Sequence, residues 1–312
     1  MNGDTVDINV LTCPSSGAAQ PSALLSDLIV ALAHAPAIPG IEDGASAELL
    51  RKSMHYSLEL RGKRARGLLV LLIAEGWNAP WQSALDCAHA VEMVHTSSLI
   101  VDDLPSMDNA SLRRGEPSNH EKFGEPTAVL AGISLLSEAL RLLASSKELS
   151  PGQRNDAVAC LTSAIGPVGM AAGQMRDIYP VASAVEDVEF THALKTGSLF
   201  AAAAELGCIA AGIDGPRKWM LSDYGMLLGK AFQEFDDLID VAAPTQASGK
   251  DAQKDKDKPT VVSIVGREVA AKRALRQVAM SLECLEASCI QSKELHRFTL
   301  ELTRAMRRTV GK

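Results

Sequence analysis

Residues 97–115 read SSLIVDDLPSMDNASLRRG, and the predicted fold is organised around this stretch. An apolar helical segment leads into two adjacent carboxylates, and Pro105 then disrupts regular helix. The charged groups of the stretch are three carboxylates and two guanidinium groups: Asp102, Asp103, Asp108, Arg113 and Arg114. Clustered carboxylates repel one another unless a cation neutralises them, and oxygen ligands without His or Cys suit Mg²⁺. Because guanidinium forks match phosphate geometry, the stretch predicts a diphosphate site.

A second acidic cluster lies at residues 229–241, GKAFQEFDDLIDV. Its aspartates, Asp236, Asp237 and Asp240, are spaced i, i+1, i+4 among large apolar side chains, so two of them stack on one helical face. Taken alone, the first cluster could be a solvated acidic turn with a basic exit. Two clusters on one chain can face each other across a cavity and hold several Mg²⁺ ions, and the pair is much more specific than either half.

These two motifs resemble the first and second aspartate-rich motifs of the trans-isoprenyl diphosphate synthases. The matching segments are DDLPSMD with the RRG that follows it, and FQEFDDLID. The resemblance extends from about Leu24 into the C-terminal region and is nearest to the bacterial short-chain members, in particular geranylgeranyl diphosphate synthases. It implies head-to-tail (1′–4) condensation of isopentenyl diphosphate with an allylic diphosphate, which is dimethylallyl, geranyl or farnesyl diphosphate.

The metal site is predicted from the same resemblance. It implies three Mg²⁺ ions, two on Asp102 and Asp108 and one on Asp236, which neutralise the allylic diphosphate as it leaves. Mn²⁺ is the alternative ion. The aspartates of both motifs are candidate metal ligands: Asp102, Asp103, Asp108, Asp236, Asp237 and Asp240. A water-poor pocket is required, because water would quench the allylic cation.

A GKRARG segment precedes the third predicted helix. A basic cluster there is most often a solvated helix start, but this one resembles the family's GKRxRP motif. The resemblance implies that Lys63 and Arg66 bind the diphosphate of isopentenyl diphosphate, although Gly67 stands where proline is usual. His95, on an apolar helix, and Arg114 match the remaining ligands of that diphosphate.

The segment KTG, residues 195–197, interrupts an otherwise apolar helical run. Glycine inside a helix costs about 1 kcal/mol relative to alanine, so it predicts a kink or a close approach. By resemblance, Lys195 and Arg113 contact the allylic diphosphate. Thr196 and Gln233 are then expected to turn their oxygens toward the nascent carbocation.

Two further polar segments match family motifs. GKDAQKDKDKPT has the composition of a solvated loop, but its resemblance to GKDxxKDxGKxT implies that Lys250 clasps the allylic diphosphate when the loop closes. Lys258 is a weaker candidate, and Asp257 replaces a glycine of the motif. GQMRD resembles GQxxD, in which Gln174 and Asp177 support the metal-lined wall.

Product length is expected to be set upstream of the first aspartate motif, where the growing prenyl tail descends. Ser97 and Ser98 lie five and four residues before Asp102, where an aromatic residue is the family's usual plug for a fifteen-carbon product. These small side chains and the two-residue insertion in DDLPSMD favour the twenty-carbon geranylgeranyl diphosphate. Met93 or a bulky residue from another helix would form the floor. A farnesyl diphosphate synthase is the alternative.

Composition favours an all-helical fold. Apolar residues make up 46% of the 312 residues but aromatic residues only 4%, so the core depends on good helix formers. Periodicity predicts about ten helices in one domain, residues 21–312, after a disordered tail over 1–20. The resemblance implies a bundle around a deep central cavity. The helices are expected at residues 22–35, 45–60, 68–77, 81–103, 125–146, 152–178, 185–212, 216–242, 260–290 and 292–308.

Charge and patterning limit the partners. The net charge of −7 argues against nucleic-acid binding. The six cysteines have no metal-ligand or redox spacing, which indicates a reducing compartment. Neither a secretory signal nor an uninterrupted apolar run of about eighteen residues is found, so we expect a cytoplasmic protein without a transmembrane segment. The resemblance implies a homodimer.

Three other interpretations remain open. A class I terpene cyclase also uses an aspartate-rich metal site, but it needs no second diphosphate site such as Lys63, Arg66 and His95 would provide. A non-catalytic partner subunit of a prenyl diphosphate synthase usually lacks one or both aspartate motifs, whereas both are present here. A helical magnesium-dependent pyrophosphohydrolase would need a water-activating group, and the sequence offers no obvious one.

Overall fold

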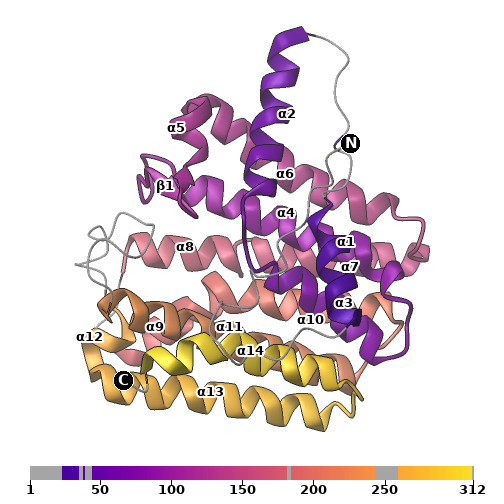
Figure 1. Cartoon of the computed structure of the whole chain (residues 1–312), viewed down its shortest axis with the longest axis vertical. Helices are drawn as coiled ribbons and strands as arrows, with labels where there is room; N and C mark the ends of the chain where they lie inside the picture. Colours follow the sequence, from indigo (N-terminus) through magenta and orange to yellow (C-terminus); the bar gives the residue numbers. More distant parts are fainter. Residues whose placement is uncertain (1–22, 35–37, 39–43, 181–183, 243–258, 311–312) are drawn as a thin grey trace.

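A computed structural model describes residues 23–34, 38, 44–180, 184–242 and 259–310, with side chains except at 240–242 and 305–310. The predicted tail, residues 1–20, lies outside the described residues, as do Lys250, Asp257 and Lys258. The described chain is helical apart from one short hairpin, which confirms the predicted all-α class. Figure 1 shows α13 and α14 along one edge of the bundle, with α2, α5 and the hairpin at the other.

The main helices are α1 Ala23–Ala33, α2 Gly44–Glu59, α3 Ala65–Gly76, α4 Leu85–Asp102, α6 Glu125–Ser145, α7 Pro151–Ile165, α8 Met170–Ile178, α9 Val185–His192, α10 Ser198–Ala210, α11 Pro216–Ala242, α13 Arg267–Ala287 and α14 Lys293–Val310. The short helices are α5 Asn119–Phe123 and α12 Val261–Val265, and a 3₁₀ turn, Trp81–Ala84, precedes α4. A π-helical turn, Ala193–Gly197, joins α9 to α10, and the hairpin pairs β1 Leu112–Arg113 with β2 Glu116–Pro117.

Three of the predicted long helices depart from one regular α-helix in the structure. The helix expected at 152–178 is divided by a turn that contains Pro167, because proline cannot continue helical hydrogen bonding. The helix expected at 260–290 is divided at Gly266, whose φ of 81° lies in the left-handed region. The run at 185–212 is continuous but contains the π turn. These interruptions and α5 account for the additional helices in the described ranges.

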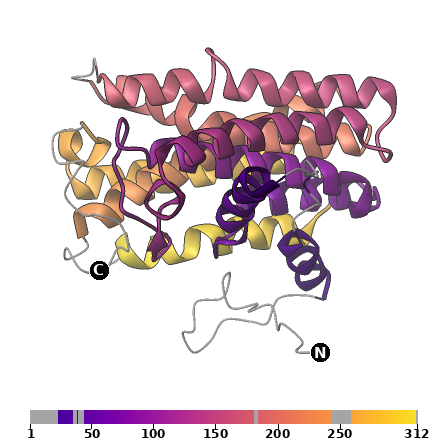
Figure 2. The same ribbon diagram turned by 90° about the horizontal axis from the view of Figure 1, so that it is seen from above.

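The core is built from aliphatic side chains and alanine, as the composition predicts. Helix α4 packs against α6, α3 and α10, and α11 packs against α10 and α13. The largest fully buried side chains are Tyr224, Phe200 and Phe235. Figure 2 shows α7 and α8 in an outer layer of the bundle, away from α13 and α14. The first aspartate motif begins at the end of α4, and the second lies on α11. Both helices pack against α10.

The expectation that no helix could cross a membrane is not confirmed. By length and mean hydropathy alone, three helical stretches of the described chain would suffice: Glu125–Ser145, Pro151–Ile178 and Val185–Ala210. The buried share is 67% for the last of these, against 39% for Glu125–Ser145 and 22% for Pro151–Ile178.

The crossing of α10 over α3 requires a glycine at position 207. A Cβ atom there would lie 2.7 Å from the Val70 carbonyl oxygen and 2.8 Å from Ile73 Cβ, closer than van der Waals contact allows. The two helix backbones therefore approach through Gly207, and any larger residue must separate them.

We predict that Gly207→Ala lowers the free energy of unfolding by about 1–3 kcal/mol, because the added methyl overpacks the crossing. Urea denaturation followed by circular dichroism measures this. The control is Gly152→Ala at the start of α7, where a Cβ meets nothing within 4 Å; this variant should be neutral or up to about 1 kcal/mol more stable. Equal stability of Gly207→Ala and the wild type would contradict the prediction.

Candidate active site

The first aspartate motif is placed at the C-terminal end of α4. This helix is buried over most of its length, and its apolar packing carries the carboxylates to the rim of the bundle. The turn that follows folds back, because the Asp108 backbone N–H donates to the Asp102 carbonyl at 2.9 Å. Burial raises the pKa of Asp102 to about 6, Lys195 opposes this rise and Asp108 adds to it. Asp102 is therefore a carboxylate that an added cation would stabilise.

Asp103 has a different environment from Asp102. Its side chain is buried, and the Nε of Arg113 donates to both carboxylate oxygens, at 3.0 and 3.1 Å, with a further bond from Nη2. Burial raises the pKa of Asp103, and Arg113 opposes that rise. The structure thus directs Asp103 toward Arg113.

The RRG segment forms the turn of the hairpin. Arg113 pairs with Glu116, which leaves Arg114 and Gly115 as the two turn residues, with φ of 56° and 83°. Positive φ at both positions is the signature of a type I′ turn, whose second residue is usually glycine. The turn therefore directs two adjacent arginines to different partners.

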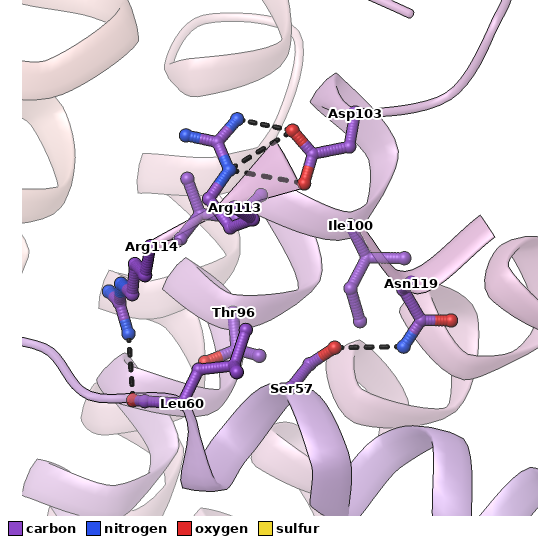
Figure 3. Close-up of a pocket in the computed structure, with 9 residues that line it drawn as sticks. Ser57, Leu60, Thr96, Ile100, Asp103, Arg113, Arg114 and Asn119 are labelled. Atoms are coloured by element: carbon purple, nitrogen blue, oxygen red, sulfur yellow. Dashed lines mark hydrogen bonds and ion pairs between the residues drawn. The ribbon is translucent and has the colours of Figure 1, made fainter. Parts of the chain in front are cut away.

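Arg114 crosses the backbone of the GKRARG segment. Its Nη1 donates to the Leu60 carbonyl at 3.2 Å, and a Cβ on Gly62 would lie only 2.4 Å from the same nitrogen. Gly62 therefore leaves the space that the guanidinium occupies. Figure 3 shows Asp103, Arg113 and Arg114 around a pocket between α2, α4 and the hairpin. The pocket is lined by Ser57, Leu60, Thr96, Leu99, Ile100, Asp103, Arg113, Arg114 and Asn119.

The start of α3 carries the other predicted diphosphate ligands. Arg66 is buried, and burial lowers the pKa of its guanidinium to about 10, although Glu92 and Asp236 favour the charge. Lys63 is exposed, with its Nζ 5.3 Å from the ring centre of Phe232. Asp236 is near enough to Arg66 to raise the pKa of the guanidinium, so the second aspartate motif lies close to this basic segment.

Glu92 was missed by the sequence analysis. Its carboxylate accepts a bond of 2.8 Å from the Gly67 backbone N–H and lies 3.9 Å from Arg64 Nη1. Proline has no backbone N–H, so the glycine found here provides a link to α4 that proline could not. An acidic residue among the apolar residues of this predicted helix marks Glu92 as unusual, but its partners follow only from the packing of α3 against α4.

His95 lies among these arginines. Burial lowers the pKa of His95 well below its ordinary value, and Arg66, Arg114 and Arg113 lower it further. The imidazole is therefore neutral near pH 7 and can still donate one hydrogen bond. The structure thus brings together three of the four residues predicted to bind isopentenyl diphosphate.

The KTG segment forms the π turn, as the helix-interior glycine indicated. A Cβ on Gly173 of α8 would lie 2.2 Å from the Lys195 backbone nitrogen, and one on Gly197 would lie 2.5 Å from Met226 Sδ. The turn is therefore held tightly between α8 and α11. Single π turns are frequent at functional sites because they redirect side chains. Here, Lys195 Nζ lies 2.8 Å from Asp177 Oδ2.

Thr196 and Gln233 are joined as well. The Thr196 hydroxyl donates to Gln233 Oε1 at 2.9 Å, and Gln233 Nε2 donates to Asp237 Oδ1 at 3.3 Å. Asp237 also lies 3.4 Å from His192 Nε2, and burial lowers the pKa of His192 to about 4. The second aspartate motif is thereby tied to the π turn. The Gln174 amide is buried and makes no hydrogen bond within the described chain, and the Asp240 side chain lies outside it.

The described residues contain no ready-made cluster of three or more His, Cys, Asp or Glu side chains that could hold a metal ion. The oxygen-only donors and the raised pKa of Asp102 nevertheless fit a hard divalent cation. Mg²⁺ needs few protein ligands when a phosphate supplies others. The carboxylates of the two motifs therefore fit a site that a diphosphate completes.

The two serines upstream of Asp102 are oriented differently. Ser97 is buried and its hydroxyl donates to the Gly132 carbonyl of α6 at 2.8 Å. Ser98 is partly buried and its hydroxyl donates to the His95 carbonyl at 2.9 Å. Met93 is buried one helical turn further from the motif. Ser97 therefore takes part in α4–α6 packing.

Comparisons with known proteins identify the class. The polyprenyl synthetase family model matches residues 47–294, so the chain belongs to the polyprenyl synthetase family. A geranylgeranyl diphosphate synthase of Pseudescherichia vulneris is 37% identical over 257 residues, which cover 81% of this chain and 83% of the relative. A chloroplastic geranylgeranyl pyrophosphate synthase of Arabidopsis thaliana is 42% identical over 236 residues, covering 72% of this chain and 66% of the relative.

Solved structures agree with the fold. A geranyltransferase of Helicobacter pylori, complexed with magnesium and isoprenyl diphosphate, matches with a TM-score of 0.77 and 29% identity over 94% of this chain and 99% of its own. An FPP/GFPP synthase of Zymomonas mobilis, in its apo form, matches with a TM-score of 0.74 and 30% identity over 90% of this chain and 92% of its own. The predicted resemblance and the predicted isoprenoid-synthase fold are therefore confirmed.

We predict that Asp103→Asn lowers the free energy of unfolding by about 3 kcal/mol, because it leaves Arg113 without its carboxylate partner in a buried position. Chemical denaturation gives the value. The matched control is Glu138→Gln, which removes the carboxylate paired with the exposed Arg141; we expect a change within about 0.5 kcal/mol. If both variants lose the same small amount, the pair of Asp103 and Arg113 does not stabilise this rim.

Proposed function

We propose that this chain is a prenyltransferase that condenses isopentenyl diphosphate with allylic diphosphates, head to tail, to make geranylgeranyl diphosphate. The supporting observation is the placement of opposite charges on four elements, which are α4, the π turn, α11 and α3. Asp102 is close enough to Lys195 of the π turn for that cation to lower the pKa of Asp102, and Arg66 of α3 is close enough to Asp236 for that carboxylate to raise the pKa of Arg66. Carboxylates flanked by two separate sets of cations suit two diphosphates and their metal ions.

The allylic diphosphate is proposed to lie between the two aspartate motifs. Asp102, Asp108 and Asp236 would hold three Mg²⁺ ions, with Mn²⁺ as an alternative. When bound, these ions supply electrostatic stabilisation of the departing diphosphate. Lys195 and Arg113 would bind its oxygens from the π turn and the hairpin. By resemblance, Lys250, Lys258 and Asp240 would complete the site from outside the described side chains.

Isopentenyl diphosphate is proposed to bind where Arg66, His95 and Arg114 come together, with Lys63 of the same basic segment as the fourth ligand. The guanidinium groups provide charge, and the neutral His95 provides a donor without adding to the repulsion among the cations. The double bond then attacks the allylic cation, and a proton leaves to the departing diphosphate. Thr196 would turn a lone pair of its hydroxyl toward the positive charge, because its hydrogen is already donated to Gln233.

A product assay tests this function. Purified protein receives isopentenyl diphosphate, Mg²⁺ and one of the three allylic starters, and the dephosphorylated products are sized by chromatography. We expect a twenty-carbon alcohol from every starter and no product when EDTA removes the metal. A fifteen-carbon product would support a farnesyl diphosphate synthase. Absence of elongation by folded protein would favour the non-catalytic subunit.

The chain-length proposal predicts the effect of a single substitution. Ser98→Phe should shift the main product from twenty to fifteen carbons, because an aromatic ring would occupy the path of the tail. Ser97→Phe is the comparison: its hydroxyl is bonded to α6, so we expect loss of stability as well. A twenty-carbon product from folded Ser98→Phe would place the floor elsewhere.

We also propose that the chain is a homodimer and that residues 21–312 form one domain. Helix α6 exposes an apolar stripe on the side opposite α4, comprising Val129, Leu130 and Ile133 with exposed fractions of 40%, 54% and 59%. Sedimentation velocity of the wild type should give twice the chain mass of 33.1 kDa. The variant Ile133→Glu should shift the measured mass down toward that of the single chain. A monomeric wild type would contradict the proposal. A cytoplasmic location stays a prediction.

A further inference from the structure

Two of the six phenylalanines in the chain lie beneath the basic segment at the start of α3. The guanidinium carbon of Arg66 is 4.5 Å from the ring centre of Phe200, and Lys63 Nζ is 5.3 Å from that of Phe232. The two rings also contact each other, with centres 5.8 Å apart and planes inclined by 39°. The shorter of the two cation–ring distances, that of Arg66, lies well within cation–π range.

Arg66 needs an orienting contact that leaves its donors available. Its side chain is buried, yet Nε makes no hydrogen bond to any described residue. A carboxylate in direct contact would occupy the N–H groups, whereas an aromatic face attracts the cation through its quadrupole and leaves the N–H edge open. The Phe200 ring therefore holds the guanidinium without competing for its hydrogen bonds.

Phe200 is itself fixed in place. It is fully buried on α10, directly after the π turn that carries Lys195 and Thr196. A Cβ on Gly229 of α11 would lie 3.1 Å from both Cβ and Cδ2 of Phe200, so the ring packs closely against that helix. Because α10 and α11 hold the ring in place, the guanidinium of Arg66 on α3 packs against a fixed surface.

We propose that Phe200 is a positioning residue, which orients Arg66 by a cation–π contact so that its N–H groups face the diphosphate of isopentenyl diphosphate. This inference rests on the proposed function. Lost orientation should weaken binding of isopentenyl diphosphate and leave the affinity for the allylic diphosphate nearly unchanged, because Lys195 and Arg113 contact that ligand from other elements.

The test changes the electrostatics of the ring while nearly preserving its volume. Mono-, di- and trifluorophenylalanine are incorporated at position 200 of the full chain, and dissociation constants for isopentenyl diphosphate are measured by calorimetry. Each fluorine withdraws density from the ring face, so we expect a stepwise rise that reaches about five- to tenfold. The same series at Phe235, which is fully buried on α11 and has no cation over its ring within the described chain, is the matched control and should leave the constant unchanged.

A second arm uses natural residues. Phe200→Leu should raise KM for isopentenyl diphosphate about tenfold, with kcat and KM for the allylic starter within about twofold of wild type. In an Arg66→Gln background, Phe200→Leu should raise KM for isopentenyl diphosphate little further, because the cation that the ring would orient is absent. Thermal denaturation of every variant identifies any loss of folding.

The outcomes separate this inference from the proposed function. If the wild type binds isopentenyl diphosphate and the fluorinated series at 200 leaves the constant flat, the positioning role is wrong and the function stands. If Phe200→Leu costs as much in the Arg66→Gln background as in wild type, the ring acts through packing alone. If the wild type does not bind isopentenyl diphosphate, the proposed function is lost, and this inference with it.

Discussion

The rest of the structure depends on the burial of carboxylates at the end of α4. Asp103 is stabilised within the protein by the hairpin arginine, Arg113. Its neighbour Asp102 has a pKa raised to about 6 even though Lys195 opposes the rise. Two adjacent residues of one motif thus differ in role: one fixes the hairpin, and the other presents charge that a metal ion would stabilise. The tight turn of the hairpin then directs Arg114 toward the segment between α2 and α3, which couples the hairpin to the basic segment.

Close backbone approaches place the remaining groups. The π turn is held between α8 and α11 at Gly173 and Gly197, and this packing presents Lys195 and Thr196 on one turn. Glycines in the motifs of this family member therefore act as packing contacts, and the charged residues beside them carry the chemistry that we propose. The cost of glycine in a helix is offset where the helices pack more closely.

Basic groups near a reactive cation must bind anions without losing their own donors. The structure meets this requirement in two ways. His95 is kept neutral by burial and by the arginines around it, and Arg66 lies against an aromatic face instead of a carboxylate. The carboxylate of Glu92 accepts a hydrogen bond from the Gly67 backbone N–H. From there its negative charge raises the pKa of Arg66. A chain with so few aromatic residues uses two of them at this position.

The sequence by itself determined the helical class, the family and the two aspartate motifs, because apolar periodicity and motif spacing are local properties of the chain. Tertiary structure decided which member of a motif has which partner. Adjacent residues such as Asp102 and Asp103 look equivalent in a sequence, but burial and a distant hairpin make them different. Likewise, the sequence analysis assigns no role to Phe200 or Glu92, and the packing of α10 and α4 against α3 gives each of them a basic partner. Contacts between elements far apart in the chain leave no local pattern, and for that reason these roles could not be predicted from the sequence.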